Sequence, residues 1–335
     1  MPETITIKEA LALNNPIFVD VRSPKEFQQD HILNAINIPV LSDEERHIVG
    51  TIYKQVSQDQ AIEKGMEYYE EKIPQIKEFV KNYKEKTIIV YCWRGGMRSK
   101  IIATLFESLG YKTYQLKGGY KTYRTLILEQ LTNFKIKPKL FVLHGLTCTG
   151  KTNLLQKLPN AIDLEGLAQH RGSLYGAIGL KPRSQKMFDN LLLKKLEELN
   201  NQPFIFIEGE SRRVGDLMLP ESLWKAMKKG NNLLIERDLN IRIKEMVKEY
   251  FLNPKIVEEI KEISSKLWKV ISKEKKAELL TNLNNNEFEK AAEILLINYY
   301  DPLYNHSLNK INYSSTIKNN DLDVCIKELL EKVSL

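Results

Sequence analysis

Cysteine is scarce in this chain, with only three among 335 residues. So few thiols exclude the disulfide-stapled frameworks of small secreted proteins. A reducing cytoplasm is therefore the predicted compartment, and a cysteine in an unusual setting is expected to work as a free thiol.

Long apolar runs are also missing, since none approaches the roughly 20 residues that a membrane-spanning helix needs. The first residues, MPETITIKEALALNNP, lack the basic start and apolar core of a secretory signal. We therefore expect no membrane partner. A content of 42% apolar and 28% charged residues is typical of a globular protein, and the length suits two domains.

The charge excess is modest, with a formal net charge of +7. Such an excess is compatible with a polyanionic partner such as a nucleic acid, and it is equally ordinary for a lysine-rich protein. Charge alone therefore leaves the partner open.

Alternating strand and helix patterns predict a parallel-sheet domain over residues 1–132. Buried strands are expected at residues 17–21, 86–91 and 112–119. Before the last of these, residues 99–109 place apolar side chains on one face of a helix that ends at a glycine. Strands that alternate with helices form a parallel sheet covered on both faces.

A second α/β domain is predicted for residues 133–335, which places the boundary near residues 130–137. Its first strand is expected at residues 140–145, and from Leu239 onward the patterns are mainly helical and charged. The loop after that first strand, described below, is typical of a P-loop NTPase-like domain. The predicted fold class is therefore α/β throughout, with a helical tail. Further apolar runs lie at 161–166, 203–211 and 231–237.

The stretch YCWRGGMRSK places Cys92 directly after a buried strand and before a helix. Two glycines in the turn let successive backbone N–H groups point inward, and such a nest binds an anion. Two nearby arginines and the positive end of the helix also favour a thiolate. We therefore predict that Cys92 is a reactive nucleophile. The predicted site comprises Cys92, Arg94 and Arg98 with the loop residues Gly95, Gly96 and Ser99.

This loop resembles the active loop of rhodanese domains, whose cysteine carries a sulfur or selenium atom. The upstream segment DVRSPKEFQQDHILNAINIP and the later LKGGY match the same family, so the resemblance covers roughly residues 5–130. Cys92 and Arg98 also have the C-x5-R spacing of cysteine phosphatases, although Tyr91 stands where tyrosine phosphatases usually have a histidine. A phosphatase stays open here as the less favoured alternative.

The stretch GLTCTGKT fits the phosphate-binding pattern G-x-x-x-x-G-K-[ST] between a strand and a helix-like run. Its backbone N–H groups are expected to cradle a diphosphate, its lysine to neutralise the charge, and its last threonine to reach Mg²⁺. Cys148 occupies a variable position and is interpreted as filler. The predicted phosphate-binding residues are Gly145, Thr147, Thr149, Gly150, Lys151 and Thr152.

Acidic residues follow two further strands of this domain. Glu208 ends the run IFIE and is the predicted Mg²⁺ partner of Thr152, with Glu210 as an alternative and Asp163 as a second acid. The structural alternative is that the acids after the strand only pair with Arg212 and Arg213. A glycine-rich segment, AQHRGSLYGAIG, adds a predicted substrate loop, and the substrate-contacting candidates are His170, Arg171, Gly172 and Arg212.

The combination of both loops in one chain resembles the tRNA 2-selenouridine synthase family. CWRGGMRS, HIVGTIYKQ and IDLEGLAQHRGS carry the resemblance, which covers most of the chain and is weakest after about residue 255. It implies a cytoplasmic transferase without a tightly bound cofactor, except for possible use of Mg²⁺. It also implies that selenium from selenophosphate replaces the sulfur of wobble 2-thiouridine in tRNA, through an S-geranyl intermediate made from geranyl diphosphate.

A tRNA partner would need basic and aromatic contacts. Lys135, Lys137 and Lys139 are predicted to contact phosphates, and Trp93, Tyr111 or Tyr175 to stack on the base. Whether the P-loop holds geranyl diphosphate, ATP or both stays open. So does a second function, a nucleotide-regulated carrier that delivers persulfide to a partner.

Overall fold

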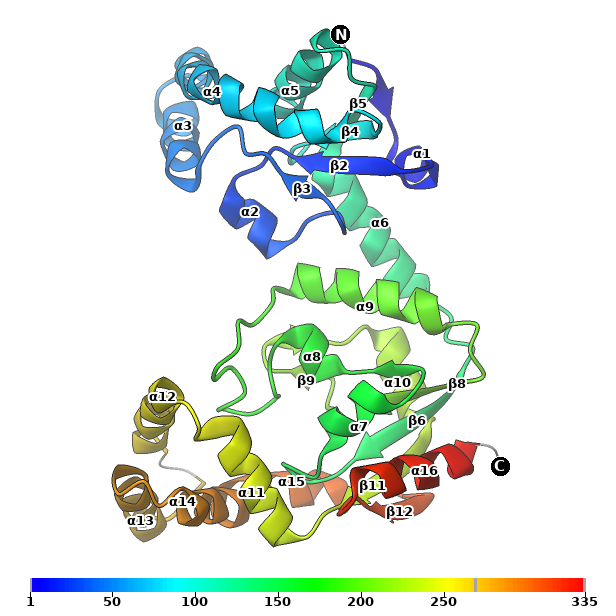
Figure 1. Ribbon diagram of the computed structural model, residues 1–335, viewed down its shortest axis with the longest axis vertical. Coiled ribbons are helices and arrows are strands. Elements are labelled where there is room, and N and C mark those ends of the chain that lie inside the picture. Colours follow the sequence, from blue (N-terminus) through cyan, green and yellow to red (C-terminus); the bar gives the residue numbers. More distant parts are fainter. Residues whose placement is uncertain (1, 268–269, 334–335) are drawn as a thin grey trace. The chain divides into compact units, whose positions relative to one another are not determined.

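The computed structural model describes residues 2–267 and 270–333 (Figure 1). The chain forms two compact units, one ending at Gln130 and the other beginning at Leu131. This division falls inside helix α6 (Gly119–Asn133). Each unit contains its own five-stranded parallel sheet, so the predicted α/β class is confirmed for both.

The sheet of the first unit has the order β1-β5-β4-β2-β3, with β4 in the centre. Ile88, Ile89 and Val90 of β4 have no exposed surface because both faces of this strand are covered. Helix α5 (Met97–Ser108) follows β4 and packs against β4 and β5. The predicted strands correspond to β2, β4 and β5. The strands are β1 (Thr4–Ile5), β2 (Pro16–Asp20), β3 (Ile36–Asn37), β4 (Thr87–Tyr91) and β5 (Thr113–Leu116).

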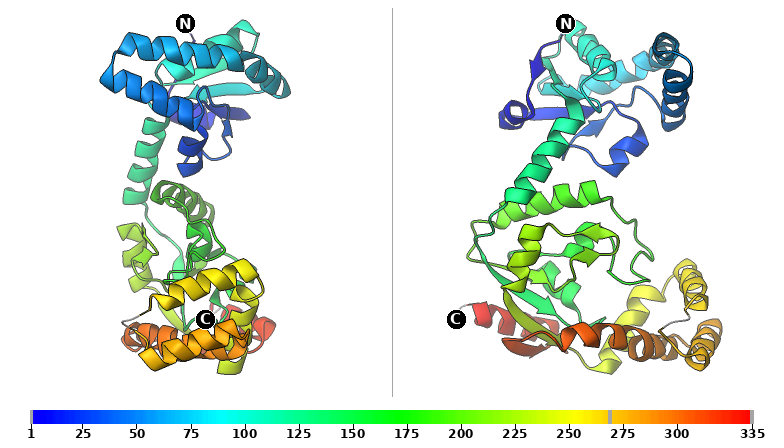
Figure 2. Two further views of the ribbon diagram at one scale, coloured as in Figure 1. Left: turned by 90° about the vertical axis from the view of Figure 1, so that its left-hand side faces the viewer. Right: turned by 180° about the vertical axis from the view of Figure 1, so that it is seen from behind.

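A pair of long helices, α3 (Asp43–Gln55) and α4 (Gln58–Val80), was not predicted from the sequence. They lie side by side in both orientations (Figures 1 and 2). Ser42 and Glu45 form a capping box that starts α3, and Ser57 caps α4. Tyr69 and Ile76 of α4 enter the core that contains Val90 of β4. The remaining helices of this unit are α1 (Ile7–Ala12), α2 (Pro24–Gln29) and the 3-10 turn Lys81–Tyr83.

A buried ion pair ends β2. The Arg22 guanidinium donates to both carboxylate oxygens of Asp20 and, at 2.6 Å, to the carbonyl of Asp30. Its Cζ atom also lies 4.0 Å from the ring centre of Tyr120. The side chains of Asp20 and Arg22 are 0% and 2% exposed. The DVR motif therefore ties the end of β2 to Asp30 after α2 and to Tyr120, which is distant in the chain.

The second unit has the sheet order β12-β11-β6-β8-β7. The chain after Leu239 is mainly helical, as expected, but it also contains an edge strand that was not predicted: residues 315–318 form β12, which pairs in parallel with β11. A four-residue run with alternating exposure is too short to stand out between helical patterns. The strands are β6 (Lys139–His144), β7 (Ala161–Ile162), β8 (Phe204–Glu208), β11 (Asn231–Glu236) and β12 (Ser315–Lys318), and β9 (Arg213–Val214) pairs with β10 (Leu217–Met218) outside this sheet.

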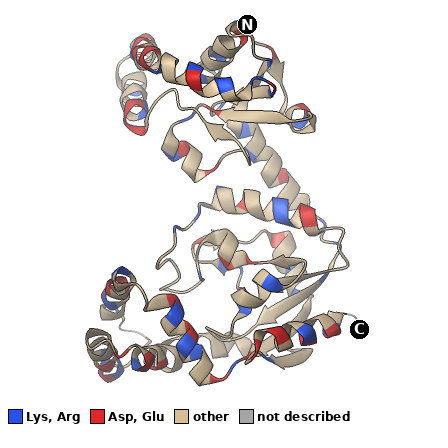
Figure 3. Ribbon diagram, in the orientation of Figure 1, with Lys and Arg blue, Asp and Glu red and all other residues tan. Residues whose placement is uncertain are grey.

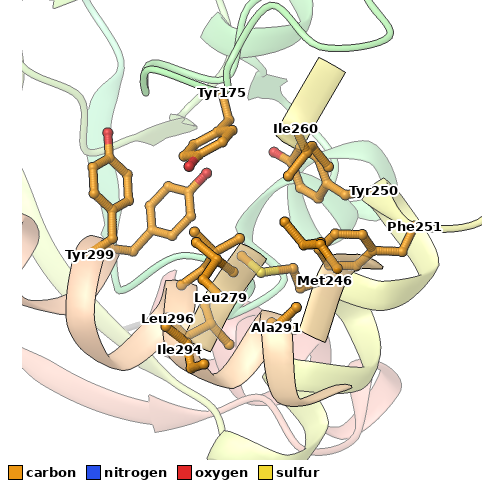
Figure 4. Close-up of a cluster of buried hydrophobic side chains, with 14 of the residues drawn as sticks. Tyr175, Met246, Tyr250, Phe251, Ile260, Leu279, Ala291, Ile294, Leu296 and Tyr299 are labelled. Carbon is orange, nitrogen blue, oxygen red and sulfur yellow. The ribbon is translucent and has the colours of Figure 1, made fainter. Parts of the chain in front are cut away.

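Helices of this unit fall into two groups. One group surrounds the sheet, and the other forms a tail with a separate apolar core (Figure 4). Tyr175 and Ile178 from the segment between α8 and α9 also enter the tail core. The first group is α7 (Lys151–Lys157), α8 (Leu164–Ala168), α9 (Gln185–Leu199), α10 (Glu221–Lys228) and α16 (Leu322–Val333). The tail is α11 (Leu239–Tyr250), α12 (Pro254–Ser265), α13 (Lys273–Asn284), α14 (Phe288–Leu295), the π-helical turn Leu296–Tyr300 and α15 (Asp301–Leu308).

Acidic and basic residues are interspersed along the helices of each unit, as α16 shows (Figure 3). Among the residues that the structure describes, no helix has the length and apolar character that crossing a bilayer requires.

The Asp20–Arg22 pair yields a stability prediction. Asp20→Asn removes the charge that compensates a buried guanidinium, and we expect it to lower the free energy of unfolding of the first unit by about 3–5 kcal/mol. Urea unfolding followed by circular dichroism measures this. The matched control is Glu85→Gln, an exposed carboxyl of the same unit, which should change stability by less than about 0.5 kcal/mol. An equally small effect of Asp20→Asn would show that the pair does not hold β2.

Candidate functional site

Cys92 lies at the carboxyl end of β4, where the loop turns around its sulfur. The side chain is buried, and Sγ accepts the N–H of Gly96 at 3.2 Å. Ser99 Oγ lies 3.3 Å from the same sulfur. The structure thus places two of the predicted loop residues, Gly96 and Ser99, against the thiol of Cys92.

The loop is held in place by Gln115 of β5, which sequence reasoning missed. Its amide Nε2 donates to the carbonyls of Gly95 and Gly96 at 2.8 and 3.1 Å, and to Ser99 Oγ at 2.9 Å. Gly95 has φ of +67°, and a Cβ there would lie 2.7 Å from the carbonyl oxygen of Leu116. Only glycine fits this turn. A buried glutamine inside a strand was the signal available in the sequence.

The two predicted arginines occupy different settings. Arg98 Nη1 lies 3.1 Å from Glu26 Oε2, and Arg46 Nε lies 2.8 Å from the same oxygen. Burial alone would raise the pKa of Glu26, but the two guanidinium charges lower it below its ordinary value. Arg94 is exposed. The Arg98 charge is therefore shared with a carboxylate rather than reserved for the sulfur.

A cavity of about 820 Å³ opens beside Cys92. One wall is the thiol loop from Cys92 to Arg98, and the other walls come from residues 40–69, which include α3 and the first half of α4. Trp93, one of the predicted base-stacking residues, is part of the lining. Because the helix pair was not predicted, neither was this cavity.

The second loop connects β6 to α7 in the other unit. Gly150 has φ of +83°, and a Cβ there would lie 2.5 Å from Asn319 Nδ2. That same amide donates to the carbonyl of Thr149 at 2.7 Å. Lys151 Nζ donates to the carbonyls of Gly145 and Leu146 at 2.8 and 3.2 Å, so the ammonium group lies over the loop. The predicted sequence pattern therefore forms a closed turn with its lysine folded inward.

A cavity of about 310 Å³ adjoins this loop. The loop contributes residues 147–153 to its lining. The tail contributes aromatic side chains, and this contact between the tail and the P-loop was not predicted. The other side chains used below are Asp163, Glu165, Arg171, Glu210, Glu245, Glu249, Tyr250, Tyr300 and Tyr304.

The predicted Mg²⁺ partner, Glu208, lies behind this cavity and is not part of its lining. It is 1% exposed, and its Oε2 accepts the N–H of Glu165 at 2.9 Å. Its other oxygen is buried without a hydrogen-bond partner among the described residues. Glu210 lines the cavity, as does Asp163, which also caps α8 through the N–H of Gly166. The cavity therefore presents the alternative acid, Glu210.

These oxygen donors suit Mg²⁺ together with phosphates. Magnesium keeps several waters and takes only one or two carboxylates, with phosphate oxygens completing its shell. Thr152 and Glu210 border the same cavity, so they could hold such an ion. Within residues 2–267 and 270–333, no three His, Cys, Asp or Glu side chains come together as a self-sufficient metal site.

Burial raises the pKa of Glu208 well above its ordinary value, and the nearby charges of Glu165 and Asp163 raise it further. Burial also raises the pKa values of Glu165, Asp163 and Glu210. The group therefore retains protons at a pH where exposed carboxyls have lost theirs.

The predicted substrate loop is divided between the cavity and the protein framework. Arg171 lines the cavity, donates to the carbonyl of Ile178 at 3.0 Å and lies 4.9 Å from the ring centre of Tyr250. His170 and Gly172 bond to each other, since the N–H of Gly172 reaches His170 Nδ1 at 3.0 Å, and neither is part of the lining. Arg212 is exposed outside the cavity. No ion pair joins Arg212 or Arg213 to the acids after β8 in the described part of the chain.

Two tyrosines that were predicted to stack on the base, Tyr175 and Tyr111, instead pack within the protein. Tyr175 is 1% exposed in the tail core, and its hydroxyl lies 3.0 Å from Ser264 Oγ, so its ring is not open for stacking on a base. The ring of Tyr111, the other of these two, packs on Phe106.

Cys148 and the predicted tRNA-binding lysines have different settings. Cys148 packs against the tail core, and burial raises the pKa of its thiol. The three lysines predicted to contact tRNA, Lys135, Lys137 and Lys139, are all exposed.

Comparison with known proteins identifies both units. The tRNA 2-selenouridine synthase AAA domain matches residues 138–279, and the rhodanese-like domain matches residues 5–125. A tRNA 2-selenouridine synthase from Hydrogenovibrio crunogenus is 32% identical over 90% of this chain and 92% of its own length. One from Sulfurovum sp. is 31% identical over 90% and 91%, and one from Nitrosomonas europaea is 34% identical over 74% and 66%. The resemblance found in the two loops thus extends along the chain.

The buried acids yield a pH-dependent prediction. A carboxyl whose pKa is raised on folding stabilises the protein below its unfolded pKa, and this stability is lost as the pH rises through the folded pKa. Glu208→Gln mimics the protonated form, so we expect it to raise the unfolding temperature at pH 8 and to have a smaller effect at pH 5. Each 1 kcal/mol added to the free energy of unfolding should raise the unfolding temperature by about 2–4 °C in a unit of this size.

The matched control is Glu259→Gln, an exposed carboxyl on α12. It should leave the difference between pH 5 and pH 8 unchanged. Calorimetric scans at the two pH values make the measurement. A destabilising Glu208→Gln at pH 8 would show that Glu208 is held as a carboxylate.

Proposed function

Because this chain belongs to the tRNA 2-selenouridine synthase family, we propose that it is a tRNA-modifying transferase that replaces the sulfur of wobble 2-thiouridine with selenium. Selenophosphate supplies the selenium, and an S-geranyl nucleoside made from geranyl diphosphate is the intermediate. The observation that supports this best is the pair of dissimilar loops, a thiol loop at Cys92 and a phosphate loop at Lys151, each beside its own cavity.

The first step belongs to the phosphate loop. The sulfur of 2-thiouridine attacks C1 of geranyl diphosphate, and the C1–O bond breaks with its electron pair on the diphosphate. The uridine then loses the proton on N3. The leaving group gains negative charge, which Lys151 can offset directly and which Mg²⁺ beside Thr152 and Glu210 would offset further.

Alkylation prepares the sulfur to leave. A thione sulfur departs as sulfide, which is a poor leaving group, whereas an alkylated sulfur departs as a thiolate that takes up one proton. In the second step selenium attacks C2, the C2–Se bond forms, and the C2–S bond breaks with its electrons on sulfur. The product is 2-selenouridine with release of geranyl thiol.

Electron balance suggests how Cys92 delivers the selenium. Thiolate attack on the selenium of selenophosphate would release phosphite and leave a selenosulfide, which needs a reductant. Attack on phosphorus instead breaks the P–Se bond with its electron pair on selenium, so selenide is released and water later removes the phosphoryl group as phosphate. Ser99 Oγ, 3.3 Å from the sulfur, can donate a hydrogen bond that stabilises the departing thiolate.

The tRNA would be held mainly through its phosphates. Lys135, Lys137 and Lys139 are exposed and suit this contact. The wobble base must leave its stack to reach either loop. Trp93 lines the cavity beside Cys92, so among the predicted stacking residues it is the candidate for holding the base there.

Lys151→Ala tests the role of the phosphate loop. Loss of a charge-assisted contact costs about 1.5–3 kcal/mol, so we expect geranylation of 2-thiouridine tRNA to slow by about tenfold to a hundredfold. Selenation of tRNA that already carries S-geranyl-2-thiouridine should be nearly unchanged. Nucleoside mass spectrometry quantifies both products.

The control for Lys151→Ala is Lys157→Ala, on the same helix but exposed beside Asp323. It should affect neither step. If Lys151→Ala slows both steps equally while tRNA binding is intact, the two loops act as one site and the assignment of steps fails.

Cys92→Ser tests the thiol loop. We expect it to abolish 2-selenouridine formation while S-geranyl-2-thiouridine accumulates in the tRNA, because serine is a far weaker nucleophile. Cys325→Ala, which removes the buried thiol of α16, is the control and should retain selenation. Undiminished selenation by Cys92→Ser would refute the proposed role, and absence of both nucleosides with the wild-type protein would favour a persulfide carrier or a phosphatase.

A further inference from the structure

The cavity beside Cys92 is much larger than its predicted anion requires. Its volume of about 820 Å³ lies in the range of pockets that enclose drug-sized organic ligands. A selenophosphate ion would occupy only the part next to the sulfur. We call this cavity the thiol pocket; it is lined by the loop from Cys92 to Arg98, by Ile101 and by residues between Val40 and Tyr69.

The walls of the thiol pocket are mainly apolar. Val49 of α3, Met66 of α4 and Ile101 of α5 come from three different helices, and all three are also packed against the core of this unit. Tyr53 and Met97 are 58% and 49% exposed, although both are large hydrophobic side chains in the lining. Apolar surface that is hollowed and open in this way marks a ligand site.

The charged members of the lining are all basic. Arg46, Lys54, Arg94 and Arg98 line the thiol pocket, and no Asp or Glu among the described residues does. Glu26, outside the lining, pairs with Arg46 and Arg98 and offsets part of this charge, so the lining keeps a positive excess through Lys54 and Arg94. The phosphate-loop cavity has the opposite character, since Asp163, Glu165, Glu210, Glu245 and Glu249 line it. An apolar chain attached to an RNA therefore matches the thiol pocket better than it matches the acidic cavity.

We propose that the thiol pocket binds the geranyl chain of the S-geranyl nucleoside while selenium displaces it. This inference rests on the proposed function and identifies the substrate group held in the first unit. The ten-carbon chain lies along α3 and α4, which brings its sulfur and C2 toward Cys92. As the C2–Se bond forms, the C2–S bond breaks, the sulfur takes up a proton, and geranyl thiol remains in the pocket until it leaves.

Chain-length selectivity follows from this arrangement. The pocket should bind an S-geranyl nucleoside more tightly than an S-methyl nucleoside, because the geranyl chain buries a large apolar area there and a methyl group buries almost none. The selectivity should appear in the selenation step, and it should be independent of the phosphate loop. We expect wild-type protein to selenate S-geranyl tRNA with a kcat/KM at least about tenfold above that for S-methyl tRNA.

Gly50 offers a direct test. It lies on α3 in the lining of the thiol pocket, and a Cβ there would meet no atom within 4 Å. Gly50→Leu therefore adds bulk to open space and also replaces a poor helix former. We expect it to raise the KM for S-geranyl tRNA by about tenfold or more, with kcat/KM for S-methyl tRNA unchanged. Gly50→Ala should have a smaller effect.

The matched control is Ile48→Phe, which enlarges a side chain on the same helix outside the thiol pocket. It should leave both substrates unaffected. Equal loss for S-geranyl and S-methyl tRNA in Gly50→Leu would overturn the proposal, as would equal wild-type rates for the two substrates.

A binding measurement keeps this inference separate from the proposed function. Calorimetric titration with the free S-geranyl-2-thiouridine nucleoside should show binding to the wild-type protein and to Lys151→Ala. Binding should weaken about tenfold or more in Gly50→Leu, and the S-methyl nucleoside should bind far more weakly. If the wild-type protein makes no 2-selenouridine, the proposed function fails while this titration still decides the inference. The inference is overturned if the S-geranyl nucleoside binds the Gly50→Leu variant as tightly as it binds the wild-type protein.

Discussion

Burial of one central strand on both faces is the constraint on which each site depends. In the first unit β4 has no exposed surface from Ile88 to Tyr91, and in the second Leu143 near the end of β6 has none. Because packing on both faces fixes the position of the strand, the residue that follows it also has a fixed position. The carboxyl ends of parallel strands meet at one edge of a sheet, which is where ligands bind in such folds. Cys92 and Gly145 occupy that point in their respective sheets.

A strand end alone does not shape a loop, because the loop carbonyls also need donors. Both units meet this need with an amide side chain from another part of the sheet. Gln115 of β5 donates to the carbonyl of Gly95, and Asn319 after β12 donates to the carbonyl of Thr149. The partners are 20 and 170 residues apart in the chain, so in both units the loop depends on a side chain that lies outside its own sequence motif.

The separation in the chain between interacting residues explains what the sequence could predict. Strands, loops and the thiol and lysine positions depend on short patterns, and these were found. Contacts between distant segments were not, which is why the α3–α4 walls, β12 and the tail tyrosines at the P-loop were missed. The sequence analysis placed Glu208 ahead of Glu210 as the Mg²⁺ partner, but the strand pattern could not support this order. The strand ends at Glu208, so its alternation no longer tells which acid faces the cavity.

The opposite character of the two cavities explains why one chain needs both units. A diphosphate beside Glu165 and Glu210 would be repelled by carboxylates unless they kept their protons or a cation lay between the charges. Lys151 supplies one positive charge, and Mg²⁺ would supply more, so the acidic cavity suits a leaving group that arrives with a metal ion. The selenophosphate and RNA that we propose as substrates also carry negative charge, and the thiol pocket offers them basic side chains and apolar walls. A single cavity could not be acidic enough to hold the metal and basic enough to accept a second anion, and this conflict favours two separate sites.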